Sequence, residues 1–298
     1  MKRSSIKKKD YLAGYLFIAP PIIGFMLFSF IPIVFSLVLS FSEYDFFTGE
    51  INLIGFEGYA RAIEDELFFK SLGNICIALG GVLIQIAVML GVALLLTAKV
   101  KGVTFFRALF FIPSLCSSVA VTLVWKWVYN YDFGILNGLL TGLGLDKVGW
   151  LIDTRVAMIS MIIQGIWMGI GGGMVMYIAG LKNAPRQFYE AAEIDGANAF
   201  QRFFHITLPC VSPTTFYILV TTIIGTVSDF ARYKLMNNGG PDYSTLTPVL
   251  YIYQTAFSSQ YGYDYTYATA MSWLTGLFII VLVAGTFISS KRWVHYSD

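Results

Sequence analysis

Residues 190–209 read EAAEIDGANAFQRFFHITLP, and this stretch decides how the rest of the chain is interpreted. It lies between two long apolar runs, yet it carries Glu190, Glu193, Asp195, Arg202 and His205. The whole chain of 298 residues is 56% hydrophobic and only 13% charged. A soluble domain usually carries about 25% charged residues. Most of the chain is therefore expected to face lipid, which makes a patterned polar segment unusual.

Six long runs without charge surround this segment or precede it. A helix needs roughly 20 apolar residues to cross a bilayer, whereas membrane-barrel strands are shorter and alternate in polarity. The first run is too long for the core of a signal peptide, so it is expected to remain as a span. We expect an all-α membrane protein, one transmembrane domain over residues 1–298, with spans at residues 12–40, 71–98, 105–129, 156–181, 207–230 and 265–290.

The basic residues indicate the orientation, because Lys and Arg gather on the cytoplasmic side of a membrane protein. The acids lean to the opposite side, where all seven acidic residues of 43–66 fall in the first outer loop. Both termini are therefore expected in the cytoplasm, as is the loop 182–206. The N-terminal charges are interpreted as this orientation signal rather than as a nucleic-acid site. The basic residues on the predicted cytoplasmic side are Lys2, Arg3, Lys7, Lys8, Lys9, Lys99, Lys101, Arg107, Lys182, Arg186, Arg202, Lys291 and Arg292.

The local pattern of the loop predicts two short helices joined by a turn. Asn183 is suited to cap the first helix and Pro185 to lie in its first turn. Gly196 is suited to the left-handed conformation that ends a helix, and a second helix is expected over 197–204, before Pro209. The alternative is an amphipathic hairpin lying on lipid. The acidic residues argue against it, because interfacial helices are usually basic.

The loop also resembles a known family. Glu190-Ala191-Ala192, then Gly196 and Ile206-Thr207-Leu208-Pro209, resembles the EAA loop of permeases from binding-protein-dependent ABC importers. The longer form PRQFYEAAEIDGANAFQRFFHITLP is similar to the carbohydrate branch. Further stretches resemble first-position permeases of the maltose and glycerol-phosphate type: YLFIAPPIIGFMLFSFIPIVFSLVLSF near the start, FIPSLCSSVAVTLVWKWVYNYDFGILN at 111–137 and NNGGPDYSTLTPVLYIYQTAF at 237–257.

The resemblance implies a type I ABC importer permease fold and a multi-pass protein of the bacterial plasma (inner) membrane. It implies a second permease subunit, favouring a heterodimer, two ATP-binding subunits, an extracytoplasmic solute-binding protein and a carbohydrate substrate. Membrane lipid surrounds the chain and nucleic acid is not a partner. In that family the loop is a coupling helix that seats in a groove of the ATPase. The implied coupling residues here are Glu190, Ala191, Ala192, Asp195 and Gly196.

Motifs for catalysis are missing from the sequence. It contains no GxxxxGK[ST] phosphate loop, no HExxH and no GxSxG. Cys76, Cys116 and Cys210 lack metal-ligand spacing and are interpreted as small hydrophobic residues. We therefore expect no enzyme, no catalytic residue, no metal and no cofactor in this chain, with ATP and Mg on the partner ATPase. Gly165, Gly169 and Gly173 are spaced for close helix packing.

Polar residues within spans are the candidates for a substrate pathway, because they are costly in lipid and often functional. Gln164 and Trp167 are three residues apart and share a helical face, so they are the first candidates. Trp125 is the next. The alternative for Trp125, as for Trp127 and Tyr129, is an interfacial aromatic belt. Asp229 is the fourth, with a local ion pair to Arg232 as its alternative. Asn74 and Gln85 are further polar residues inside spans.

Two other classes of protein are considered beside the importer. An ATP-independent secondary carrier or channel would need an intramembrane charge pair for ion coupling, and inverted repeats. The sequence offers only Asp229 as a charge near the membrane, and it shows no obvious repeat. A membrane-bound enzyme would need a catalytic pair at one membrane face. The sequence departs from the family before its last outer loop, where Ala231 and Asn237 replace the more usual residues, and this affects the expected substrate more than the fold.

Overall fold

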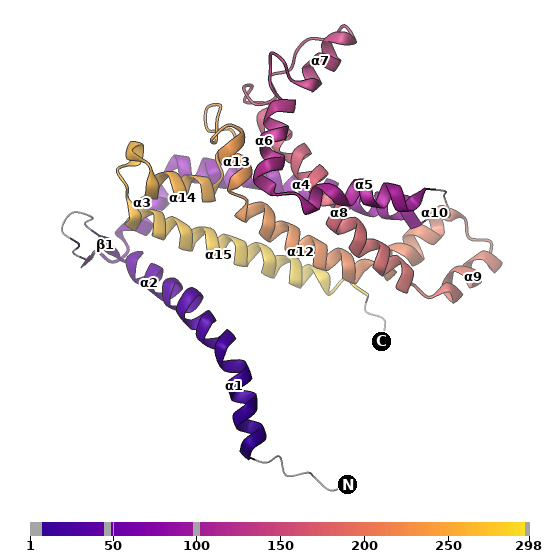
Figure 1. The fold of residues 1–298 in the computed structure, drawn as a ribbon, viewed down its shortest axis with the longest axis horizontal. Helices are drawn as coiled ribbons and strands as arrows, with labels where there is room; N and C mark the ends of the chain where they lie inside the picture. The colour runs from indigo at the N-terminus through magenta and orange to yellow at the C-terminus, as the bar shows by residue number, and fades with distance from the viewer. Residues whose placement is uncertain (1–7, 45–48, 50, 98–101, 296–298) are drawn as a thin grey trace. The chain divides into compact units, whose positions relative to one another are not determined.

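The computed structural model describes residues 8–44, 49, 51–97 and 102–295, and these residues are almost entirely helical (Figure 1). The chain forms two compact units, residues 1–64 with 254–274, and residues 65–253 with 275–298. Several residues used to predict the orientation lie outside the described part of the chain: Lys2, Arg3, Lys7, Lys99 and Lys101.

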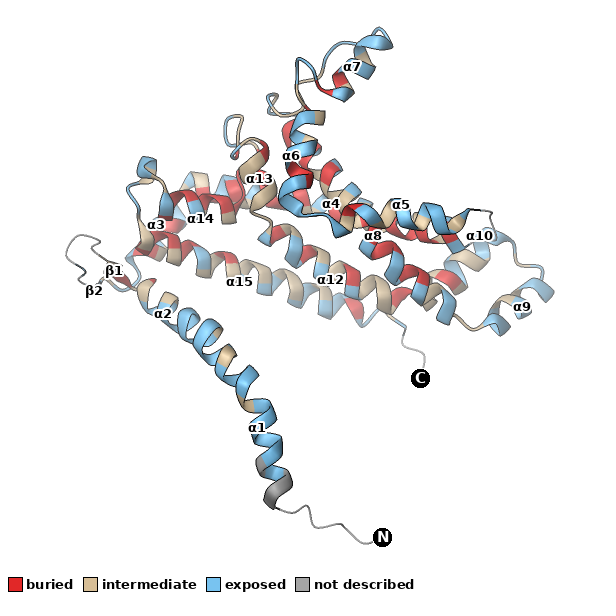
Figure 2. Cartoon of the chain, in the orientation of Figure 1, coloured by how far each residue is buried: buried red, intermediate tan, exposed pale blue. Residues whose placement is uncertain are grey.

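The first unit begins with one long apolar helical run. It consists of α1 (Lys8–Phe25), a π-helical turn (Met26–Phe30) and α2 (Ile31–Leu39). Figure 2 shows most of the described residues of this run as exposed, and side chains such as Phe17 are 83% exposed. Large apolar side chains on every side of a helix are suited to lipid rather than water. This is the environment expected for the first span.

The rest of the first unit is a small polar assembly. Strands β1 (Ser42–Tyr44) and β2 (Ile51–Leu53) pair antiparallel, a short ribbon in an otherwise helical chain. They are followed by α3 (Glu57–Glu64), the 3₁₀ turn η3 (Ser259–Tyr261) and the start of α15 (Tyr265–Ser290). Arg61 of α3 forms an ion pair of 2.6 Å with Asp264 and stacks on the ring of Tyr267.

The second unit is built around three helices that run side by side, α4, α8 and α12 (Figure 1). Its buried core joins Met89 and Ala93 of α4 to Met174 and Tyr177 of α8 and Ile218 of α12. The elements of this unit, in chain order, are α4 (Glu66–Thr97), α5 (Val103–Leu115), α6 (Ser118–Val128), α7 (Ile135–Gly142), α8 (Ala157–Asn183), α9 (Arg186–Ile194), α10 (Ala199–Arg202), a π-helical turn (Phe203–Thr207), α11 (Leu208–Cys210), α12 (Ser212–Ser228), α13 (Ala231–Met236), most of α14 (Pro248–Phe257) and the larger part of α15.

Glycines on α8 allow this close packing, as their spacing predicts. A Cβ atom at Gly169 would overlap the side-chain amide of Gln85, and one at Gly173 would overlap Met89. At Gly171 it would lie 2.6 Å from the carbonyl oxygen of Phe110 on α5. The absence of a side chain at these positions lets neighbouring helices approach the α8 backbone.

Four described helical runs are long and apolar enough to cross a membrane, and up to six if each of two bent pairs is one span. The six crossings therefore remain a prediction. The four runs are Ala13–Leu39, Glu66–Thr97, Ala157–Asn183 and Tyr265–Ser290; the two pairs are Val103–Leu115 with Ser118–Val128, bent by 102°, and Ala199–Cys210 with Ser212–Ser228, bent by 64°.

The third and fifth predicted spans, 105–129 and 207–230, are therefore not straight helices. In the third, Pro113 lacks a backbone donor and Cys116 adopts an extended conformation, so the helix stops and restarts. In the fifth, Val211 leaves the helical region between two prolines, Pro209 and Pro213. An uncharged run of sufficient length predicts a span, but it does not show where the helix breaks.

Candidate functional site

The polar loop between α8 and α12 folds as the predicted helix–turn–helix. We call residues 186–202 the hairpin. Gly196 has a φ of +76° and ends α9. The amide of Gly196 donates to the carbonyl of Glu193, and the amide of Ala197 donates to that of Ala192 at 2.8 Å. These two bonds satisfy the last carbonyls of α9 and define a Schellman motif.

The start of each hairpin helix differs from the prediction. Asn183 ends α8 instead of capping α9, and Pro185 occupies the cap position. The second helix begins at Ala199 rather than at residue 197, and it runs on past residue 204 through a π-helical turn and α11 to Cys210. Asn198 caps α10 by a reciprocal pair of bonds with Gln201, a capping box that the sequence displays but that was not predicted.

Two side-chain contacts hold the hairpin together. Arg202 of α10 forms an ion pair of 2.8 Å with Glu193 of α9. The hydroxyls of Tyr189 and Thr207 lie 3.0 Å apart and tie α9 to the segment that leads into α12. The hairpin is therefore a braced unit rather than an open loop.

The hairpin exposes both acidic and apolar side chains. Glu190, Ala191, Asp195 and Gly196 are exposed and Ala192 is partly exposed. Large apolar groups beside them were not singled out by the sequence analysis: Ile194 is 87% exposed and Phe200 is 72% exposed. Ile194, an isoleucine within the otherwise polar α9, was the signal in the sequence that could have indicated an exposed apolar group here. Small, apolar and acidic groups together form a surface suited to another protein.

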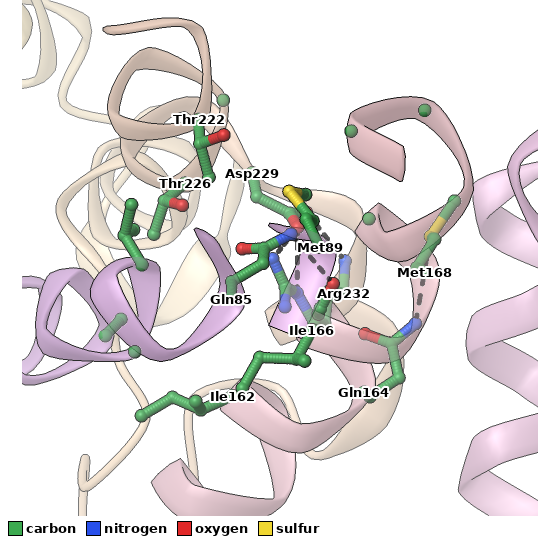
Figure 3. A pocket seen from close by; sticks show the side chains of 18 of the residues that line it. Gln85, Met89, Ile162, Gln164, Ile166, Met168, Thr222, Thr226, Asp229 and Arg232 are labelled. Atoms are coloured by element: carbon green, nitrogen blue, oxygen red, sulfur yellow. Dashed lines mark hydrogen bonds and ion pairs between the residues drawn. The ribbon is translucent and has the colours of Figure 1, made fainter. Parts of the chain in front are cut away.

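A second candidate site is a cavity of about 410 Å³ between α4, α8, α12 and α13 (Figure 3). Its size is typical of small-molecule sites. Two of the candidate substrate-pathway residues, Gln164 and Asp229, line this cavity together with Gln85. The other polar groups lining it are Ser118, Thr122, Thr221, Thr222, Thr226, Arg232 and Tyr233.

Asp229 forms the predicted ion pair with Arg232. The Nε atom of Arg232 donates to Asp229 at 2.8 Å, and a second guanidinium nitrogen donates to the same carboxylate oxygen. The Nη1 atom donates to the carbonyl of Met161 at 2.9 Å. This pair joins the end of α12 to α8 through α13, and Figure 3 shows it beside Gln85. The sequence pattern predicted the pair, but not its contact with α8.

Gln164 and Trp167 have different surroundings despite their spacing. Gln164 is 1% exposed and its Oε1 atom has no hydrogen-bond partner among the described residues. Trp167 is 40% exposed, and its ring packs edge-on against that of Trp125 with the ring centroids 5.5 Å apart. Neither tryptophan is among the residues that line the cavity. The two tryptophans remain predicted pathway residues.

Tyr129 corrects part of the aromatic-belt alternative. It is 1% exposed, and its hydroxyl donates to the carbonyl of Ser160 at 2.9 Å. Its ring lies between those of Trp125 and Trp150, with centroids 5.1 and 5.6 Å away. Tyr129 is therefore a core residue that joins α6 to α8. Asn74 likewise has a structural partner, since its amide donates to the carbonyls of Tyr243 and Leu246.

The apolar helices, the braced hairpin and the partly polar cavity are features of a multi-pass membrane protein. The chain belongs to the family of binding-protein-dependent transport system inner membrane components, whose model matches residues 15–293. The chain is thus the inner-membrane permease of a binding-protein-dependent ABC importer. ATP binds the partner ATPase, and the permease is not itself an enzyme and carries no cofactor.

Individual relatives match nearly the full chain. A probable ABC transporter permease protein of Bacillus subtilis, YesP, is 38% identical over 100% of this chain and 96% of its own length. The lactose transport system permease protein LacF of Rhizobium radiobacter is 34% identical over 97% of this chain and 98% of its own. The arabinooligosaccharides permease AraP of Bacillus subtilis is 32% identical over 84% and 81%.

Solved structures share the fold. A chain of a bacterial ABC transporter that imports the acidic polysaccharide alginate superposes with a TM-score of 0.82 at 24% identity, over 96% of both chains. The type I permease fold expected from the sequence is confirmed by this match. The alternative of an ATP-independent carrier or channel is set aside, because the family is defined by dependence on a binding protein and an ABC system.

Proposed function

We propose that this chain pairs with a second, different permease subunit to form the membrane pathway for a carbohydrate that an extracytoplasmic binding protein delivers. Relatives that match most of the chain are named for lactose and for arabinooligosaccharides. The cavity between α4, α8 and α12 carries the amide and hydroxyl groups that a sugar would need. The substrate residues proposed are Gln164, Trp167, Trp125 and Asp229, of which Gln164 and Asp229 line the cavity.

The whole chain acts in this proposal as one transmembrane domain with six spans and both termini in the cytoplasm. The family match, which runs through both compact units, supports a single functional domain. The two bent helix pairs supply the third and fifth spans. With the termini inside, the hairpin lies on the cytoplasmic face, where an ATPase could reach it.

The observation that carries the coupling role is the hairpin itself. It is braced from within, while its small and acidic residues are directed to the surface. Glu190, Ala191, Ala192, Asp195 and Gly196 form the proposed contact with one of two ATP-binding subunits. Alanines allow close approach of the partner, and the turn at Gly196 sets the direction of α9. ATP-driven closure of the partner dimer would then move the hairpins and change access to the cavity.

Purification of the tagged chain from its native membrane tests this proposal. Mass spectrometry of the co-eluting proteins is expected to find a second permease and an ATPase. Ala192→Arg should lose the ATPase while keeping the second permease, because the new side chain fills the contact surface. Ala192→Ser, which keeps the residue small, serves as the control. Retention of the ATPase by Ala192→Arg would contradict the coupling role.

A further inference from the structure

The cavity of the second unit offers polarity without net charge. Among the described residues that line it, the charged side chains are those of Asp229 and Arg232, of opposite sign. They are bonded to each other rather than directed separately toward the cavity. The site therefore has zero formal charge as a whole.

Each guanidinium nitrogen of Arg232 already makes a hydrogen bond within the protein. Two of its guanidinium nitrogens donate to Asp229, and the third donates to the carbonyl of Met161. Its guanidinium group also packs directly on Gly165, where a Cβ atom would overlap it. The side chain is thus held on the surface of α8, and a carboxylate entering the cavity would meet Asp229 beside an arginine that is already neutralised.

The remaining polar groups suit a hydroxyl-rich ligand. The buried Oε1 atom of Gln164 has no partner among the described residues and is an acceptor for a hydroxyl. The cavity is also lined by Gln85, Thr222 and Thr226, whose amide and hydroxyl groups can donate and accept. Burying a polar group is costly unless it is hydrogen-bonded, and a neutral sugar would satisfy these groups without introducing charge.

We infer that the cavity selects neutral saccharides against uronates and other anionic sugars, with Asp229 as the specificity-determining residue. This inference rests on the proposed function and names the substrate class of the same site. A buried charge without a partner is strongly disfavoured. Asp229 acts here by cancelling the charge of Arg232, which would otherwise attract a carboxylate.

Ligand binding to the purified importer, without its binding protein, tests the selection at this site. The probes are a mannuronate tetrasaccharide from alginate and the neutral mannose tetrasaccharide obtained by reducing its carboxyl groups. The wild-type importer is expected to bind the neutral probe at least about tenfold more tightly. Equal or tighter binding of the mannuronate would overturn the inference and leave the importer assignment standing. Binding of neither probe would overturn the inference and leave the carbohydrate assignment to be tested with the native sugar.

Two variants test the role of Asp229. Asp229→Asn leaves Arg232 charged and should shift the ratio of the two affinities toward the mannuronate by about tenfold or more. The double variant Asp229→Asn with Arg232→Gln restores a neutral cavity and should keep the wild-type preference. An unchanged ratio in Asp229→Asn would overturn the assigned role. If Asp229→Asn fails to assemble, the double variant alone decides: a preference of the double variant for the mannuronate would overturn the role assigned to Asp229.

Discussion

Gly171 and Gly172 are neighbours on α8 with opposite surroundings. A Cβ atom at Gly171 would lie 2.6 Å from the carbonyl oxygen of Phe110 and 3.0 Å from the Cα atom of Phe111, both backbone atoms of α5. At Gly172 nothing lies within 4 Å. Because backbone cannot move aside like a flexible side chain, Gly171→Ala must displace α5. The expected cost is about 1–3 kcal/mol.

Thermal unfolding of the detergent-purified protein measures this difference. Gly171→Ala should lower the Tm clearly. Gly172→Ala should leave the Tm unchanged or raise it slightly, because alanine is the better helix former. Equal Tm values for the two variants would show that α5 does not pack on α8 as described.

Tyr129 gives a second prediction at the residue scale. Its buried hydroxyl donates to the carbonyl of Ser160, so Tyr129→Phe should destabilise the protein by about 1 kcal/mol. Tyr131 is two residues further along and is 42% exposed, so Tyr131→Phe is the matched control with no expected effect. Thermal unfolding of both variants would decide, and an unaffected Tyr129→Phe would contradict the structural role of this hydroxyl.

At the scale of elements, the hairpin can be weakened without touching its surface groups. Asn198 caps α10 through a capping box with Gln201. Asn198→Ala should cost about 1 kcal/mol of local stability. Hydrogen exchange should therefore become faster at the amides of residues 199–202. Gln187→Ala, an exposed change on α9, is the control, and unchanged exchange in Asn198→Ala would contradict the role of the cap.

Much of the hairpin was predictable because its determinants are local. Gly196 ends α9 in the conformation that glycine favours, and the capping box at Asn198 was also visible in the sequence, although it was not used. The break at Cys116 was harder to predict. A proline near the end of an apolar run does not reveal how far the next helix turns, which depends on packing against other helices.

Contacts between distant segments account for what could not be predicted of the cavity. The spacing of Asp229 and Arg232 predicted a local pair, and Gln164 was recognised as a polar group inside a span. The bond from Arg232 to the carbonyl of Met161 joins residues 71 positions apart, and no local pattern encodes it. The convergence of Gln85 with these groups likewise depends on how α4 packs on α8.

In the proposal for the whole molecule, ATP drives the transport of a carbohydrate through this chain, and the hairpin transmits the motion of the ATPase. The proposed assembly comprises this chain, a second permease, two ATP-binding subunits and a binding protein. Each proposed part has a distinct role, since the cavity would hold the sugar and the hairpin would transmit the motion of the ATPase. Altering the hairpin should therefore abolish uptake while leaving sugar binding in the cavity unchanged.

The most direct test is uptake of the sugar carried by the native binding protein into proteoliposomes that contain the assembled importer, with ATP supplied on the side of the hairpin. Wild type and Ala192→Ser should accumulate the sugar only when both ATP and the binding protein are present. Ala192→Arg should bind the sugar but fail to accumulate it. Undiminished, ATP-dependent uptake by Ala192→Arg would contradict coupling through the hairpin, and uptake by wild type without ATP would contradict the importer mechanism itself.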